Sequence, residues 1–133
     1  MRLLIIIFFL FSFSIPLAAG PKEDVQVTIS SQLQAFIDSD ISKAFTYASP
    51  SIRSMFKTPE NFGRMVKRGY PMVWRPEKVT FLEHKKSDQG RSQDVQIIDQ
   101  EGATHYLRYY LSNTIYGWKI SGVQFLNAAD YAV

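Results

Sequence analysis

The apolar residues that follow position 20 recur first with the period of a helix. An amphipathic helix is predicted by the three- and four-residue spacing of Val25, Ile29, Leu33 and Phe36. This helix should end near residues 38–40, which are polar. A second, shorter helix is predicted over residues 41–48, because the apolar residues there again fall on one side of a helical wheel.

Two more helices are predicted where a hydroxyl residue precedes a proline, at Ser49-Pro50 and at Thr58-Pro59. The hydroxyl oxygen can accept a hydrogen bond from the first turn, and proline fits the first helical position. The first of these helices is short and reaches residue 56, and the second should end at Gly69. Residues 70–76 are predicted to be an extended linker, because Tyr70 and Arg75 each precede a proline and such residues avoid the helical region.

From residue 78 onward the apolar and polar residues alternate, which is typical of strands. Four strands are predicted, over residues 79–83, 93–98, 103–111 and 118–125. The connections between them are short, and this favours an antiparallel meander. Residues 21–133 are therefore predicted to form a single α+β domain, in which the N-terminal helices pack on a four-stranded antiparallel sheet.

The first twenty residues have the pattern of an export signal. Arg2 supplies a positive charge, residues 3–15 carry none, and Ala18-Ala19-Gly20 offers small side chains for cleavage. Residues 1–20 are thus predicted to be a secretory signal peptide, and the protein to be periplasmic or secreted. The alternative is an uncleaved membrane anchor, although a spanning helix needs about 20 apolar residues.

Composition narrows the chemistry that the chain can perform. The 133 residues include no cysteine, so disulfides, thiol nucleophiles and thiolate metal sites are excluded. Two histidines are too few for a histidine metal cage, and a formal net charge of +3 is low for a nucleic-acid-binding protein. Neither a phosphate-binding loop nor a dinucleotide, serine-hydrolase or zinc-protease motif is present, so no cofactor or metal is predicted.

Several segments together resemble a known family. They read SPSIRSMF at residues 49–56, TPENF at 58–62, GYPMVWRP at 69–76 and GWKI at 117–120. The family comprises exported bacterial proteins described only as a domain of unknown function, so the resemblance implies export and a fold but no catalytic residue. The order of helices and meander is also similar to the cystatin-like cone of nuclear transport factor 2 and ketosteroid isomerase, which implies a curved sheet and an open mouth.

One face of the predicted helix over residues 59–69 is basic. Arg64, Lys67 and Arg68 lie three and four residues apart, opposite the apolar residues of the same helix. This face could contact an anionic surface, such as phospholipid, a wall polymer or an acidic partner. The alternative is an ordinary solvated helix face.

The predicted strand over residues 103–111 carries the one hypothesis for catalysis. His105 shares its face with the apolar residues, so it could act as an acid or base in a cone-shaped pocket, with Asp94 from the neighbouring strand as its partner. The alternative is a structural histidine, with Asp94 exposed near a strand end. The opposite face carries Tyr106, Arg108 and Tyr110, which could form a homodimer contact.

Aromatic and cationic side chains meet on the proline-bracketed linker, at Tyr70, Trp74 and Arg75. They suggest a binding surface at the mouth of the cone, bordered by the basic helix. The leading prediction is therefore a non-catalytic domain that binds a small apolar ligand or a protein of the cell envelope. The alternative is an isomerase or dehydratase that uses His105 and Asp94.

Overall fold

The computed structural model describes Ser14 and residues 19–131. The predicted signal peptide lies almost wholly outside the described residues. Five helices come first along the described chain: α1 (Pro21–Ile37), α2 (Ile41–Thr46), α3 (Pro50–Phe56), α4 (Pro59–Gly69) and α5 (Pro71–Trp74). Four strands follow, β1 (Pro76–Ser87), β2 (Gly90–Asp99), β3 (Thr104–Thr114) and β4 (Gly117–Leu126), and then a 3-10 turn η1 (Ala128–Asp130).

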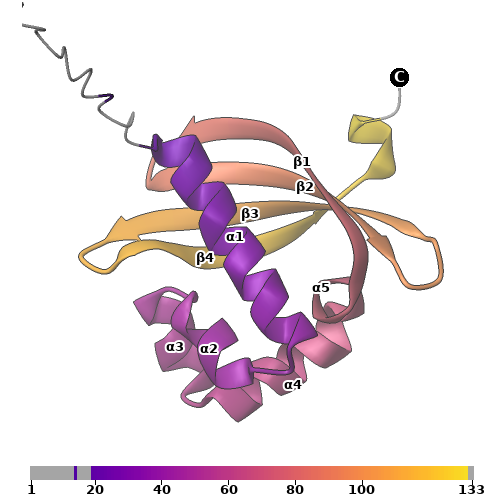
Figure 1. Cartoon of the computed structure of the whole chain (residues 1–133), viewed down its shortest axis with the longest axis horizontal. Coiled ribbons are helices and arrows are strands. Elements are labelled where there is room, and N and C mark those ends of the chain that lie inside the picture. Colours follow the sequence, from indigo (N-terminus) through magenta and orange to yellow (C-terminus); the bar gives the residue numbers. More distant parts are fainter. Residues whose placement is uncertain (1–13, 15–18, 132–133) are drawn as a thin grey trace, which may run out of the picture.

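The strands form one antiparallel sheet in the order β1-β2-β3-β4, which is the predicted meander. Figure 1 shows α1 crossing one face of this curved sheet, with α2 to α5 grouped beside the C-terminal half of α1. The predicted α+β class, with N-terminal helices packed against a four-stranded meander, is thereby confirmed. Among the described helices, none combines the length and the apolar character needed to cross a membrane.

Both predicted helix starts are confirmed by their side-chain caps. Ser49 Oγ accepts a hydrogen bond from the amide of Ile52 at 3.4 Å, and Thr58 Oγ1 accepts one from the amide of Asn61 at 3.2 Å. These interactions join residues three positions apart, so the local sequence is enough to specify them.

The predicted extended linker over residues 70–76 is wrong, because residues 71–74 form the helical turn α5. Tyr70 is indeed non-helical, with φ −136° and ψ 59°, as expected before a proline. The proline itself begins a turn, which the burial of Met72 and Val73 in the core stabilises.

The core lies between α1 and the central strands. Val25, Ile29 and Phe36 on α1 are fully buried, as are Val95 on β2 and Leu107 on β3. The predicted alternation along β3 is confirmed, because Leu107, Tyr109 and Leu111 all face the helices.

The loop between α2 and α3 is attached to the outer strand β4. Ala48 forms a parallel bridge with Ile120, in which the amide of Ser49 donates to the Ile120 carbonyl at 2.8 Å. The amide of Ile120 in turn donates to the Tyr47 carbonyl at 2.9 Å. The register between β3 and β4 shifts at the same place, between Tyr110 and Leu111. The bridge therefore fixes the start of α3 beside the sheet.

Candidate functional site

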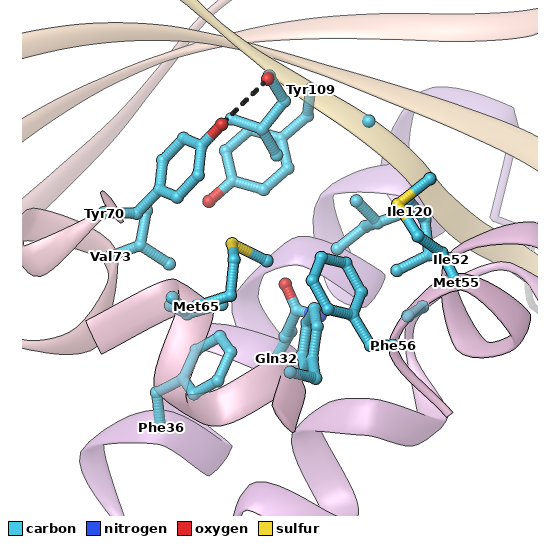
Figure 2. Close-up of a pocket in the computed structure, with 15 residues that line it drawn as sticks. Gln32, Phe36, Ile52, Met55, Phe56, Met65, Tyr70, Val73, Tyr109 and Ile120 are labelled. Atoms are coloured by element: carbon cyan, nitrogen blue, oxygen red, sulfur yellow. Dashed lines mark hydrogen bonds between the residues drawn. The ribbon is translucent and has the colours of Figure 1, made fainter. Parts of the chain in front are cut away.

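A cavity of about 250 Å³ lies between the helices and the sheet. Its walls come from α1, α3, α4, α5, β3 and β4, and Figure 2 shows their side chains surrounding it. The lining residues are Gln32, Phe36, Ala48, Ile52, Met55, Phe56, Phe62, Met65, Val66, Tyr70, Val73, Tyr109, Ile120, Gly122 and Val123. None of these described residues is charged, so the cavity is suited to an apolar molecule.

Aromatic packing holds the helical wall of the cavity. Phe62 of α4 lies at the centre of this packing, with its ring centroid 5.9 Å from that of Phe36, 5.3 Å from that of Phe45 and 5.8 Å from that of Phe56. Such tilted and edge-to-face contacts are the geometry that aromatic pairs prefer. The wall formed by α1 and α4, which Phe45 of α2 supports from behind, is therefore well fixed.

The helix α3 is a looser part of the wall. Ile52, Met55 and Phe56 line the cavity, but no residue of α3 is fully buried and Met55 is 67% exposed. α3 ends at Phe56, and the next residue, Lys57, has a φ of 70°, which is uncommon for a residue with a side chain. This side of the cavity is thus closed by a short helix with little buried surface.

Tyr109 places a polar atom in the wall of this apolar cavity. Its side chain is 1% exposed, and its hydroxyl has no hydrogen-bond partner among the residues that the structure describes. Figure 2 shows the hydroxyl pointing away from the sheet, into the space beside Tyr70 and Met65. Burial, with a smaller contribution from the nearby Tyr70, raises the pKa of the Tyr109 phenol above its usual value. The hydroxyl is therefore neutral and keeps its proton.

Two other polar side chains at the cavity donate hydrogen bonds to backbone carbonyls. Tyr70 donates its hydroxyl proton to the Val123 carbonyl at 3.4 Å, and its ring stacks on that of Phe125 with centroids 5.0 Å apart. Gln32 donates from Nε2 to the Ala44 carbonyl at 3.1 Å, and its amide oxygen is directed toward the cavity in Figure 2. Of the residues predicted to bind a ligand, Tyr70 is the one that lines this cavity.

Trp74 and Arg75 lie at a different, more open hollow of about 450 Å³. Lys67, Asp99, Glu101 and His105 also line it. The Trp74 ring is covered by the Arg75 guanidinium, 4.7 Å from its centroid, and by the Lys67 ammonium at 5.6 Å. The predicted surface at Tyr70, Trp74 and Arg75 is therefore divided between two sites.

The Arg75 guanidinium is bound to the protein itself. It donates to the carbonyls of Phe36 and Trp74 and to Ser39 Oγ at 2.9 Å. These bonds satisfy a carbonyl at the C-terminal end of α1, where a cation is favourable. Arg75 thus fastens α1 to α5.

The predicted pairing of His105 with Asp94 is wrong. In the register of β2 and β3, Asp94 lies opposite Arg108 whereas His105 lies opposite Ile97, so the two side chains point to opposite faces. Asp94 is 2% exposed, contrary to the expected exposed position, and it accepts two hydrogen bonds from Arg108, at 2.7 and 3.0 Å. This pair raises the pKa of Arg108 above its usual value.

The carboxylate partner of His105 is Asp99, with Nε2 and Oδ2 2.7 Å apart. Asp99 Oδ1 also accepts hydrogen bonds from the amides of Glu101 and Ala103, both at 2.9 Å. The His105 hydrogen bond first, and the Ala103 amide second, lower the pKa of Asp99. The pair lies at the open hollow, and His105 is not among the residues that line the apolar cavity.

The predicted basic residues lie on the exposed face of α4. Arg64 donates to Asn61 Oδ1 at 3.1 Å, and neither Arg64 nor Arg68 lines the cavity or the hollow. On the outer face of the sheet, Tyr110 donates to Gln124 at 2.8 Å, and the ring of Tyr106 stacks on that of Tyr131. No group of three or more His, Asp or Glu side chains suited to a metal occurs within the described part of the chain.

Tyr109 and Gln32 are the polar residues of the cavity that sequence reasoning missed. Both lie within apolar stripes, Tyr109 between Leu107 and Leu111 on β3 and Gln32 beside Leu33 on α1. A polar atom at an inward-facing position was the available signal, because such an atom needs a partner.

Comparison with known proteins gives one match. The profile of a family described as "Domain of unknown function (DUF4864)" matches residues 19–133. No curated protein and no solved structure matches the chain.

Proposed function

Because the chain belongs to the DUF4864 family, a domain of unknown function, we propose a function from its own geometry: it binds a small apolar molecule in the cavity and does not transform it. One observation carries this proposal, namely a cavity of about 250 Å³ with a nearly continuous apolar lining. Binding transfers the apolar surface of the ligand out of water, which is the main driving force for such sites.

The volume bounds the size of the ligand. A dry apolar cavity of about 150 Å³ accepts benzene. Scaled by volume, the present cavity accepts a molecule of about ten non-hydrogen atoms. One or two fused rings or a short branched chain fit this range.

The ligand enters past α3. This helix is the part of the wall with no fully buried residue, so displacing it exposes less apolar surface than displacing α1 or α4. We place this binding in the cell envelope or outside the cell, on the strength of the predicted signal peptide.

The enzymatic alternative has less support. An isomerase or dehydratase would need an acid or base beside the bound molecule, but His105 lies at the open hollow rather than in the apolar cavity. The cavity itself presents amide and phenol groups, and neither titrates near neutral pH. Binding without reaction is therefore the function that the cavity supports best.

Filling the cavity tests the proposal. Val123 lies opposite Tyr109 in the sheet and lines the cavity, so Val123→Phe places a ring in the space of the ligand. The matched control is Val27→Phe, at a position on α1 that is 64% exposed. Naphthalene, which has about the size expected, is titrated against the full chain and followed by its own fluorescence.

We expect Val123→Phe to weaken naphthalene binding by about tenfold or more, because the ring occupies part of the cavity. Val27→Phe should bind within about twofold of the unaltered protein. Circular dichroism and the melting temperature establish that both variants are folded. Equal binding by the two variants, or no binding by the unaltered protein, would contradict the proposal.

A further inference from the structure

The chemical class of the ligand follows from the polar atoms at the cavity, on the premise that the proposed binding function is correct. Tyr109, Tyr70 and Gln32 supply these atoms. The Tyr70 hydroxyl donates to the Val123 carbonyl and Gln32 Nε2 donates to the Ala44 carbonyl, so both donors are engaged. The Tyr109 hydroxyl is the one donor at this cavity without a partner among the described residues.

A buried hydroxyl without a partner is unfavourable, and native structures contain few of them. Tyr109 sits on the central strand β3, between the buried Leu107 and Leu111, and cannot turn its hydroxyl to solvent. The hydroxyl is itself buried and points between Tyr70 and Met65, two residues that line the cavity (Figure 2), so a ligand reaches it when the flexible Met65 side chain shifts. A ligand atom that accepts its proton would complete the hydrogen bonding of the wall.

The ligand atom that faces Tyr109 should be a neutral acceptor. The phenol keeps its proton, and a phenol is a better donor than acceptor because its lone pair is delocalised into the ring. No Lys, Arg or His is found among the described residues that line the cavity. A carboxylate or phosphate would therefore be buried without a counter-charge, which is strongly unfavourable.

We propose that the cavity selects an uncharged, mainly apolar molecule with one hydrogen-bond acceptor, such as a carbonyl oxygen, which pairs with the Tyr109 hydroxyl. Small aromatic or branched ketones, aldehydes, esters and amides belong to this class. Hydrocarbons of the same shape fit the cavity but leave the hydroxyl without a partner. Carboxylates of the same shape are excluded by their charge.

Three probes of equal non-hydrogen atom count separate these possibilities. Acetophenone carries a carbonyl, cumene replaces its oxygen by a methyl group, and benzoate carries a charge. Each is titrated by calorimetry against the full chain, against Tyr109→Phe and against the control Tyr110→Phe. Tyr110 lies on the same strand but on the outer face, where its hydroxyl donates to Gln124.

We expect Tyr109→Phe to weaken acetophenone binding by about tenfold, since it loses one buried hydrogen bond, and to leave cumene binding within about twofold. Tyr110→Phe should change neither affinity. Benzoate should not compete with acetophenone. Each fold-change compares the affinity of one probe for a variant with its affinity for the unaltered protein. The different water solubilities of the probes therefore do not affect it.

Two results would overturn the inference while the proposed function stands. In the first, Tyr109→Phe weakens the binding of acetophenone and of cumene by the same factor. In the second, benzoate binds the unaltered protein with the affinity of acetophenone. Binding of neither acetophenone nor cumene to the unaltered protein would overturn the proposed function, and the inference with it.

Discussion

Replacing Tyr109 by phenylalanine should make the free protein more stable, which is the reverse of the usual effect of removing a buried tyrosine hydroxyl. In the unaltered protein this hydroxyl is buried without a partner among the described residues. Such a group costs about 1–3 kcal/mol of stability, because it has lost its hydrogen bonds to water. Phenylalanine keeps the ring and removes the penalty.

The variant also loses the packing of one oxygen atom, and this sets the size of the net effect. At about 24 cal/mol per Å³ of added cavity, the loss is a few tenths of a kcal/mol. We therefore expect the free energy of unfolding of Tyr109→Phe to rise by about 1 kcal/mol. For a domain of this size, that rise corresponds to about 4 °C in the melting temperature.

Urea-induced unfolding, followed by circular dichroism, measures this difference. The control is Tyr110→Phe, which removes an exposed hydroxyl that donates to Gln124 at 2.8 Å. Its free energy of unfolding should fall by about 0.5 kcal/mol, so the two variants should differ in sign. The dependence on urea concentration should be the same in all three proteins, because the surface exposed on unfolding is unchanged.

The reasoning is refuted if Tyr109→Phe is destabilised as much as Tyr110→Phe. The Tyr109 hydroxyl would then have a partner inside the folded protein, and it would not be free to receive a ligand. The stability measurement therefore checks the premise of the ligand class without any ligand.

The remaining predictions concern acid stability and two glycines. The hydrogen bond from His105 lowers the pKa of Asp99 in the folded protein. The ionised Asp99 therefore stabilises the fold fully above its unfolded-state pKa of about 3.9, and this stabilisation is lost as the pH falls through the lower folded-state pKa. Asp99→Asn should flatten the acid side of the stability profile, and urea unfolding from about pH 5 down to about pH 2 would show it; an unchanged profile would contradict it. Gly90→Ala should lower the free energy of unfolding by about 2 kcal/mol or more, because its φ is 153° and a Cβ there would collide with the Leu111 carbonyl. Gly69→Ala, at the end of α4 with nothing within 4 Å of the new Cβ, should raise it by about 0.5 kcal/mol, and equal effects at the two glycines would contradict this contrast.

The parts of the fold that depend on neighbouring residues could be predicted from the sequence. The caps at Ser49 and Thr58 join residues three apart, and the alternation along β3 follows from the two-residue period of a strand. α5 could not be predicted in the same way, because the burial of Met72 and Val73 against distant parts of the chain stabilises this short turn. The rule for residues before proline applied to Tyr70 but said nothing about the residues after Pro71.

The site was harder to predict than the fold because it depends on distances between elements. Which carboxylate faces His105 is decided by the register of β2 and β3, which places Asp94 opposite Arg108. The cavity is the space left between six elements, and no local pattern encodes a space. Tyr70 was found because it is aromatic and next to a proline. Tyr109 was not singled out, because the missing partner of its hydroxyl shows only in three dimensions.

The bridge between Ala48 and Ile120 also shields an edge of the sheet. β4 is an outer strand, and the unpaired N–H and C=O groups of an outer strand can form hydrogen bonds with a strand of another molecule. Tyr47 and Ser49 occupy both backbone groups of Ile120, near the middle of that edge. A chain whose sheet has formed before residues 47–49 have docked therefore exposes a continuous edge. The docking of this loop should therefore reduce aggregation of partly folded chains through the β4 edge.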